Sequence, residues 1–331
     1  MLNLGIIGTN WISQQFVQAA VNIGKYRLHS VYSRKLSTAS EFAKEFGDAE
    51  IYDDMAKFLD DDQLEIIYIA SPNGLHFTQA KACICKGTIV IVEKPAFSTV
   101  EEMDEILSLA NEKKVFYFEA MRSIHEPSFM QIFDYIQTKE VWGADFNFAK
   151  YSSRMDELLD GGTPNIFSTE FSGGALMDLG VYLVYPAVTL FGMPQSVKYT
   201  AKMLPTGVDA YGTGVLRYEN FDVSIRPGKT IDRYTPSEIY FEEGTLSIDE
   251  ISSPSQLTYF ERGAAPIELL VEKQTNPMAD EAAVFSKIVR KNDVTAYEEL
   301  ADLSRKVNQV MKDMRDHAGI VFAADKKEDE E

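Results

Sequence analysis

IIGTNWISQQ (residues 6–15) decides how the beginning of this chain folds. An apolar run leads into Gly8, and a stretch with helical periodicity follows and ends at Gly24. A loop that holds a dinucleotide pyrophosphate usually has the pattern G-x-G-x-x-G, and here Asn10 and Ser13 replace its second and third glycines. Gly8 supplies the turn, Asn10 tolerates a positive φ, and Ser13 is small enough for close packing of helix on strand. The stretch predicts a strand, a turn and a helix whose N-terminus attracts phosphate.

The same alternation continues through the first 120 residues. Short apolar runs typical of buried parallel strands are separated by amphipathic stretches typical of helices. The apolar runs are LGIIG, RLHSVYS, EIIYIASP, TIVIVEKP and KVFYFEA. We therefore expect an α/β protein whose residues 1–121 form a Rossmann-type, doubly wound parallel sheet that binds a dinucleotide.

Strand patterns dominate after residue 121. FDVSIR (residues 221–226) alternates apolar and polar side chains, and FEEGTLSI (residues 241–248) predicts a hairpin that turns near Gly244. One helix is expected over HEPSFMQIFDYIQ (residues 125–137) and a longer one over GGALMDLGVYLVYPAVTLFG (residues 173–192). The pattern predicts an α+β domain with a mostly antiparallel, open-faced sheet.

This second domain is expected to span residues 122–323 and to bind the substrate. Two amphipathic helices, at about 277–291 and 297–316, are assigned to it. The open face of its sheet needs cover, so we expect a homodimer or homotetramer formed through that sheet. Residues 324–331 form a charged tail that is expected to be disordered.

The composition narrows the function further. The formal net charge is −19, so the chain is repelled by nucleic acid and by anionic membranes. No apolar run approaches the ~20 residues of a membrane span, and the N-terminus lacks the basic start of a signal peptide, so we expect a cytoplasmic protein. Four scattered histidines show no ligand spacing, and no metal is expected.

The end of the second expected strand, YSRKLS (residues 32–37), points to the kind of dinucleotide. NAD binders usually place an acidic residue there for the ribose diol, whereas this chain has Ser33, Arg34 and Lys35. An arginine fork suits a 2′-phosphate. The stretch therefore favours NADP(H), and NAD(H) stays the alternative. The residues expected at the pyrophosphate are those of the first turn: Gly8, Thr9, Asn10, Trp11 and Ile12.

Four further motifs together resemble those of the Gfo/Idh/MocA oxidoreductases. They are SPNGLHFTQA (71–80), VEKPAFST (92–99), EAMRSIHEPSF (119–129) and GGALMDLGVY (173–182). They occur in the family's order and spacing and span nearly the whole chain. The resemblance implies hydride transfer between nicotinamide and a carbinol or carbonyl carbon of a sugar, polyol or cyclic diol. It also implies further cofactor contacts at Ser71, Pro72, Asn73, His76, Glu93, Lys94 and Arg122.

The resemblance implies that Lys94, Asp178 and Tyr182 are catalytic and touch the substrate. Lys94 follows a parallel strand, and Pro95 keeps it out of helical geometry. Asp178 and Tyr182 are four residues apart on an expected helix and so share one face. Tyr182 is expected to exchange the proton, while Lys94 stabilises negative charge on the substrate oxygen.

Other positions leave alternatives open. His76 either lies near the nicotinamide or is a buried polar residue with a local partner. Lys150, Arg154 and Asn165 are expected to contact substrate because they lie on polar loops of the second domain. Tyr182 stands where the inositol-dehydrogenase branch often has histidine. It resembles the glucose–fructose oxidoreductase and dimeric dihydrodiol dehydrogenase branches, which favours aldoses, related carbonyl sugars or trans-diols.

A second class of function also fits the fold. Some members of this family bind a dinucleotide as a signal without turning over a substrate. Loss of the lysine or of the terminal histidine or tyrosine would favour such a sensor. Lys94 and Tyr182 are both present, so the sequence favours an enzyme.

Overall fold

The computed structural model describes residues 1–326, which form two compact units. The first unit comprises Met1–Arg122 and Gln274–Arg305, and the second comprises Ser123–Lys273 and the chain from Lys306 onward. This differs from the expected boundary, because residues 274–305 belong to the first unit. A terminal amphipathic helix has an apolar face, but the sequence pattern does not say which core that face covers.

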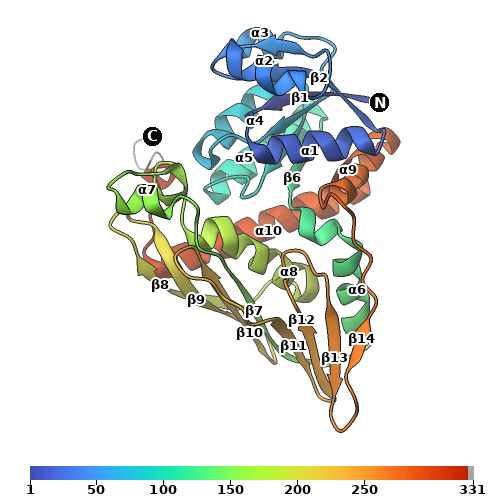
Figure 1. Cartoon of the computed structure of the whole chain (residues 1–331), viewed down its shortest axis with the longest axis vertical. Helices are drawn as coiled ribbons and strands as arrows, with labels where there is room; N and C mark the ends of the chain where they lie inside the picture. Colours follow the sequence, from blue (N-terminus) through green and yellow to red (C-terminus); the bar gives the residue numbers. More distant parts are fainter. Residues whose placement is uncertain (327–331) are drawn as a thin grey trace. The chain divides into compact units, whose positions relative to one another are not determined.

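The first unit contains a six-stranded parallel sheet in the order β3-β2-β1-β4-β5-β6 (Figure 1). Its strands are β1 (Leu2–Ile7), β2 (Tyr26–Tyr32), β3 (Glu50–Tyr52), β4 (Ile66–Ile69), β5 (Ile89–Glu93) and β6 (Tyr117–Ala120). The order reverses between β1 and β4, which is where doubly wound sheets bind ligands beyond their carboxyl ends. The predicted Rossmann-type domain is confirmed.

Helices cover both faces of this sheet. Ile66 and Tyr68 of β4 point into one core, and Ile67 and Ile69 point into the other. The first core takes side chains from α1 (Trp11–Asn22), α2 (Leu36–Lys44) and α9 (Ala279–Lys291). The second takes them from α3 (Met55–Leu59), α4 (His76–Cys85) and α5 (Val100–Lys113). Burial on both faces explains why the strands read as continuous apolar runs.

Contacts with β2 and β6 explain why α9 belongs to the first unit. Phe285 lies in the core that covers β1 and β4, and its ring stacks on Phe118 of β6 at 4.6 Å between centroids. The hydroxyl of Tyr26 on β2 donates to the carbonyl of Ala282, at 2.8 Å. The helix thus completes one face of the parallel sheet.

The second unit contains an eight-stranded sheet in the order β14-β13-β12-β11-β7-β10-β9-β8. Its strands are β7 (Val141–Ala149), β8 (Ser196–Met203), β9 (Asp209–Arg217), β10 (Asp222–Gly228), β11 (Ser237–Phe241), β12 (Gly244–Ile248), β13 (Leu257–Glu261) and β14 (Ile267–Leu269). Among the described strands of this second sheet, β7 and β10 are the one pair that runs parallel, and their carboxyl ends therefore meet at one edge of the sheet. The expected mostly antiparallel sheet is confirmed.

Helix α8 (Val181–Phe191) packs on β7 and β10. The described part of this unit also contains helix α6 (Pro127–Ile136). The expected single helix over residues 173–192 is instead a π-helical turn, Leu176–Gly180, that continues into α8. A π-turn shifts the hydrogen bonds by one residue, and periodicity alone does not reveal it. Such turns are frequent at functional sites.

The last helix, α10 (Val294–Ala318), runs from the first unit into the second, and a short 3₁₀ turn follows at Ala324–Lys326. Buried Arg315 forms an ion pair with Asp325, at 2.7 Å, which orders this part of the expected disordered tail. Residues 327–331 of that tail lie outside the described residues. Within residues 1–326, no helix combines the length and apolarity that a membrane crossing requires.

Candidate active site

The turn after β1 is built differently from the expectation. Gly8 has φ +99°, and a Cβ at this position would lie 2.6 Å from the carbonyl oxygen of Ala70, so glycine is required. Asn10 has φ −90° and ψ 177°, so its expected positive φ is wrong. Its side chain caps α1 by accepting from the amides of Ile12 and Ser13, at 2.9 and 3.1 Å.

Two side-chain bonds tie this turn to the sheet. The Nδ2 group of Asn10 donates to the carbonyl of Ala70 at the end of β4, at 2.7 Å. The buried hydroxyl of Ser13 donates to the carbonyl of Gly8, at 2.6 Å. Asn10 is therefore the N-cap residue of α1, and the small side chain of Ser13 permits close packing of α1 on the turn.

The turn fits a pyrophosphate. Asn10 occupies two amides, while the amides of Thr9, Asn10 and Trp11 meet no acceptor in the part of the chain that the structure describes. Donors at a helix N-terminus favour an anion. The strand next to β1, β2, ends at Tyr32. Ser33 follows it, and then Arg34 and Lys35 with exposed side chains at the same carboxyl edge.

His76 connects two loops at the same edge of the sheet. Its Nε2 lies 2.8 Å from the carbonyl of Ser71, and its Nδ1 lies 3.2 Å from the carbonyls of Pro95 and Ala96. Burial lowers the pKa of His76, and the Lys94 cation acts in the same direction, although the carbonyls oppose both. The ring thus connects the loop after β4 with the loop that carries Lys94. These contacts are those of a buried polar residue with local partners, which is one of the two interpretations that the sequence left open.

Lys94 is half-buried at the end of β5 and is followed by a cis peptide bond to Pro95. Its amide donates to Glu93, at 3.2 Å, and the amide of Ala96 donates to Glu119, at 2.9 Å. Burial raises the pKa of Glu93, and the Lys94 cation is the strongest opposing influence. Two acidic side chains and one histidine thus fix the backbone around Lys94.

The remaining first-unit candidates surround this edge. Pro72 and Asn73 begin the short turn between β4 and α4, and Arg122 begins the turn that follows β6. The Arg122 guanidinium is near enough to Glu93 to favour its carboxylate. The parallel sheet therefore gathers the expected cofactor residues and Lys94 at one edge.

In the second unit, Asp178 forms an ion pair with Lys229, which directly follows β10. The Lys229 side chain is only 5% exposed, and that of Asp178 is 23% exposed. The ammonium also lies 6.0 Å from the centroid of the Phe167 ring. Lys229 was missed by sequence reasoning; its only signal was a lysine after Pro-Gly at a strand end.

The glycines of GGALMDLG allow the π-turn to approach its neighbours. A Cβ at Gly173 would lie 2.4 Å from the carbonyl of Ile166, and one at Gly174 would lie 2.2 Å from Asp209. The buried Asp209 carboxylate accepts from the amide of Leu176, at 2.8 Å, and from the Tyr199 hydroxyl, at 2.6 Å. Close packing, and not chemistry, explains these glycines.

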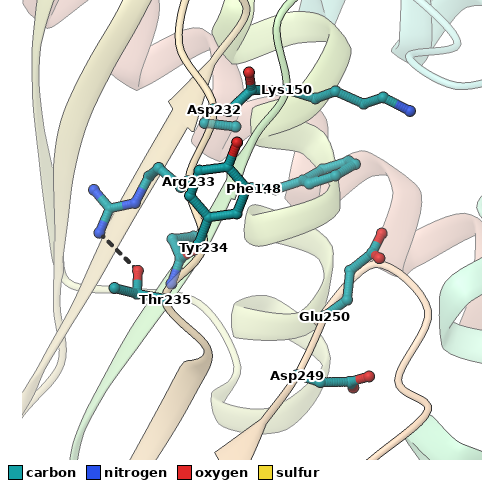
Figure 2. A pocket seen from close by; sticks show the side chains of 10 residues that line it. Phe148, Lys150, Asp232, Arg233, Tyr234, Thr235, Asp249 and Glu250 are labelled. Carbon is teal, nitrogen blue, oxygen red and sulfur yellow. Dashed lines mark hydrogen bonds between the residues drawn. The ribbon is translucent and has the colours of Figure 1, made fainter.

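Tyr182 is half-buried on α8, and its ring meets Phe148 of β7 edge to face, with centroids 5.6 Å apart. Phe148 also lines a pocket of about 310 Å³ at the end of β7. Among the residues that line this pocket, Figure 2 shows Phe148, Lys150 and Tyr234 in the upper and middle part of the view and Asp249 and Glu250 in the lower part. Lys150 lines the same pocket as Phe148 and is exposed, and its substrate role stays a prediction.

Arg154 and Asn165 line a different pocket, of about 390 Å³, together with Glu157 and Thr163–Ile166. The structure therefore does not bring Lys150 into one pocket with Arg154 and Asn165. Among residues 1–326, no group of three histidine, cysteine or acidic side chains could hold a metal ion.

Comparisons with known proteins agree with this architecture. A family model described as "Oxidoreductase family, NAD-binding Rossmann fold" matches residues 2–121, and the GFO/IDH/MocA C-terminal domain model matches residues 145–247. YgjR of Escherichia coli K12, an uncharacterised oxidoreductase, is 37% identical over 98% of this chain and 99% of its own length. The scyllo-inositol 2-dehydrogenase (NADP(+)) IolU of Bacillus subtilis is 35% identical over the same shares.

A more distant relative and a solved structure extend the comparison. The trans-1,2-dihydrobenzene-1,2-diol dehydrogenase of Mus musculus is 24% identical over 77% of both chains. The 3-ketoreductase KijD10 of Actinomadura kijaniata, in complex with NADP and TDP-benzene, has a TM-score of 0.84 at 18% identity, covering 97% of this chain and 99% of that chain. This likeness supports the fold of both units.

Proposed function

Because this chain belongs to the Gfo/Idh/MocA family of oxidoreductases, we propose that it transfers a hydride between NADP(H) and a CH–OH carbon of a cyclic polyol or sugar. One observation carries the proposal. The parallel sheet brings the Gly8 turn, the Arg34–Lys35 pair and Lys94 to the same carboxyl edge. That edge of a doubly wound sheet is where dinucleotides bind.

The cofactor-binding residues follow from this edge. The open amides of Thr9 to Trp11 would hold the pyrophosphate at the start of α1. Exposed Arg34 and Lys35 would hold a 2′-phosphate, which favours NADP(H) over NAD(H). The NADP(+) specificity in the name of the relative IolU supports the same choice.

The proton and charge chemistry is assigned to this chain's side chains. When bound, the nicotinamide supplies or accepts the hydride. In the direction of reduction, the Tyr182 hydroxyl donates a proton to the substrate oxygen, and the Lys94 ammonium stabilises the negative charge that develops there. Asp178, held in place by Lys229, accepts hydrogen bonds from neighbouring substrate hydroxyls.

We propose scyllo-inositol as the first substrate to test. The support is IolU, which is named for this activity and aligns with 98% of this chain. Tyr182 in place of the histidine of the inositol-dehydrogenase branch keeps aldoses and trans-diols in the same panel.

The experiment first titrates NADPH and NADH by fluorescence and then measures turnover on scyllo-inositol, aldoses, trans-diols and their carbonyl forms. Arg34→Ala should raise the KM for NADP about tenfold and leave that for NAD nearly unchanged. Arg27→Ala is the matched control, because Arg27 is the second residue of β2, near the opposite edge of the sheet, and donates to Asn3. NADPH binding without turnover on any substrate would favour the dinucleotide sensor, and an unchanged KM in Arg34→Ala would remove Arg34 from the cofactor site.

We further propose that the open face of the eight-stranded sheet pairs with a second copy of the chain. Tyr211 and Phe260 lie on this face, and they are 42% and 46% exposed. Thr213, two residues after Tyr211 on β9 and so on the same face, is also exposed. Sedimentation at micromolar concentration should give a dimer or tetramer that Thr213→Arg weakens; a monomeric wild-type chain would refute this pairing.

A further inference from the structure

Tyr68 is a fully buried tyrosine in the middle of the parallel sheet, and it connects the cofactor helix with the Lys94 loop. Its ring stacks on Phe16 of α1, with centroids 4.0 Å apart and planes within 5°. Its hydroxyl donates to one carboxylate oxygen of Glu93 at the end of β5. None of the motifs that point to the family includes Tyr68.

Glu93 links this tyrosine to Lys94. The second carboxylate oxygen of Glu93 accepts from the Lys94 amide, at 3.2 Å. Glu93 is only 8% exposed, so a carboxylate there needs both donors and nearby positive charge. Lys94 and Arg122 supply that charge, and the Tyr68 hydroxyl supplies a donor.

We propose that Tyr68 is a positioning residue that holds the Glu93 carboxylate beside Lys94, so that its negative charge favours the Lys94 ammonium. The inference rests on the proposed function only for the role of Lys94 in turnover. The contacts from Tyr68 through Glu93 to Lys94, called the relay below, lie within the first unit and do not require a substrate. It predicts that the buried Tyr68 hydroxyl on β4 influences the protonation of Lys94 through Glu93 on the neighbouring strand β5.

Other titratable groups around Lys94 are already engaged. His76 faces three carbonyl oxygens, and burial favours its neutral form. Glu119 accepts from the amide of Ala96, at 2.9 Å, and from the hydroxyl of Ser304 on α10. Arg122 adds a positive charge near Glu93, which supports the carboxylate and opposes the ammonium. Glu93 is the acidic residue that accepts from the Lys94 amide, and its charge and that of the Lys94 ammonium favour each other.

Tyr68→Phe tests the proposal, because phenylalanine keeps the stack on Phe16 and removes only the hydroxyl. The measurement is trace acetylation of the cofactor-free protein by acetic anhydride between pH 6 and 11, with the Lys94 peptide quantified by mass spectrometry. The labelling midpoint of Lys94 should shift to lower pH by roughly half a unit to one unit, because the Glu93 carboxylate is no longer held beside the ammonium. Where turnover is measurable, the alkaline limb of kcat/KM for carbonyl reduction should move in the same direction.

Tyr26→Phe is the matched control, since Tyr26 is also a buried tyrosine of this sheet whose hydroxyl donates to a carbonyl, that of Ala282. It should leave the Lys94 midpoint unchanged. Glu93→Gln removes the carboxylate itself and should shift the midpoint by about one unit or more, which keeps the test open if Tyr68→Phe folds poorly.

The outcomes separate two failures. A wild-type protein that turns over no substrate refutes the proposed function, while the labelling still tests the relay. A Lys94 midpoint that stays unchanged in both Tyr68→Phe and Glu93→Gln overturns the relay, whatever the activity. An equal shift in Tyr26→Phe also overturns it, because the effect would then follow from any lost buried hydroxyl.

Discussion

Replacing Lys229 by methionine removes the positive charge that faces Asp178 and keeps an unbranched apolar side chain of similar length. The Lys229 side chain is 5% exposed and that of Asp178 is 23% exposed, so the ion pair is largely shielded from water. Removing one partner of a buried pair typically costs about 3–5 kcal/mol, because the other charge is left without compensation. Asp178 keeps some contact with water, so we expect Lys229→Met to lower the free energy of unfolding of the second unit by about 2–3 kcal/mol.

The reverse change, Asp178→Asn, should cost more, about 3–4 kcal/mol, because it leaves the better-buried ammonium alone. The double variant should cost less than the sum of the single variants, with a coupling free energy of about 2 kcal/mol. In activity, Lys229→Met should lower kcat/KM at least about tenfold, because Asp178 is no longer held for substrate hydroxyls.

The assay uses the chain's two tryptophans. Trp11 begins α1 in the first unit, and Trp142 lies on β7 in the second. In a Trp11→Phe background, urea unfolding followed by fluorescence therefore reports the second unit. All four members of the double-mutant cycle are compared in this background, which serves as their common reference.

The reasoning is refuted if the effects of Lys229→Met and Asp178→Asn on the free energy of unfolding simply add. If Lys229→Met costs less than about 0.5 kcal/mol and the two substitutions add within the same margin, the two charges do not interact in solution. If stability falls as expected and kinetics do not change, Lys229 supports the fold without positioning Asp178 for the substrate.

Three further changes test other parts of the site. Tyr182→Phe should keep the edge-to-face contact with Phe148 and lower kcat by about a hundredfold, since it removes only the proton donor. Asn10→Gly should lower the free energy of unfolding by about 1.5 kcal/mol, because it loses the bond to the Ala70 carbonyl and weakens the helix cap. Burial lowers the pKa of His125 to about 4. Stability should therefore fall as the pH drops from about 6.5 towards 4, because the unfolded chain takes up the proton first, and His125→Gln should reduce that loss in urea midpoints between pH 7 and 5.

Each of these has a contrary outcome. A near-normal kcat in Tyr182→Phe would remove this hydroxyl as the proton donor. In Asn10→Gly, unchanged thermal and urea stability would mean that the cap contributes nothing, and an NADPH titration shows whether the two released amides then bind the cofactor more tightly. An acid-stability profile that is the same with and without His125 would show that its burial does not control the pH dependence.

Much of the fold was determined by local sequence pattern. The apolar strand runs between amphipathic stretches predicted a sheet buried on both faces, and alternate residues of β4 do enter two different cores. The motifs that contain Lys94 and Tyr182 helped to identify the family, which the family models confirm. The glycine-poor turn was interpreted as a cofactor loop, and Gly8 has the positive φ that this role requires.

Tertiary structure decided the rest. Asn10 was expected to take a strained conformation, but the carbonyl of Ala70, 60 residues away, and the amides of α1 hold it as a cap. The pairing of Asp178 with Lys229 joins residues 51 positions apart, and α9 covers the first sheet although it follows the second in sequence. Periodicity and motifs record which residues are buried and where elements end. They do not record which distant charge or carbonyl meets a side chain, because those partners come together only when the sheets assemble.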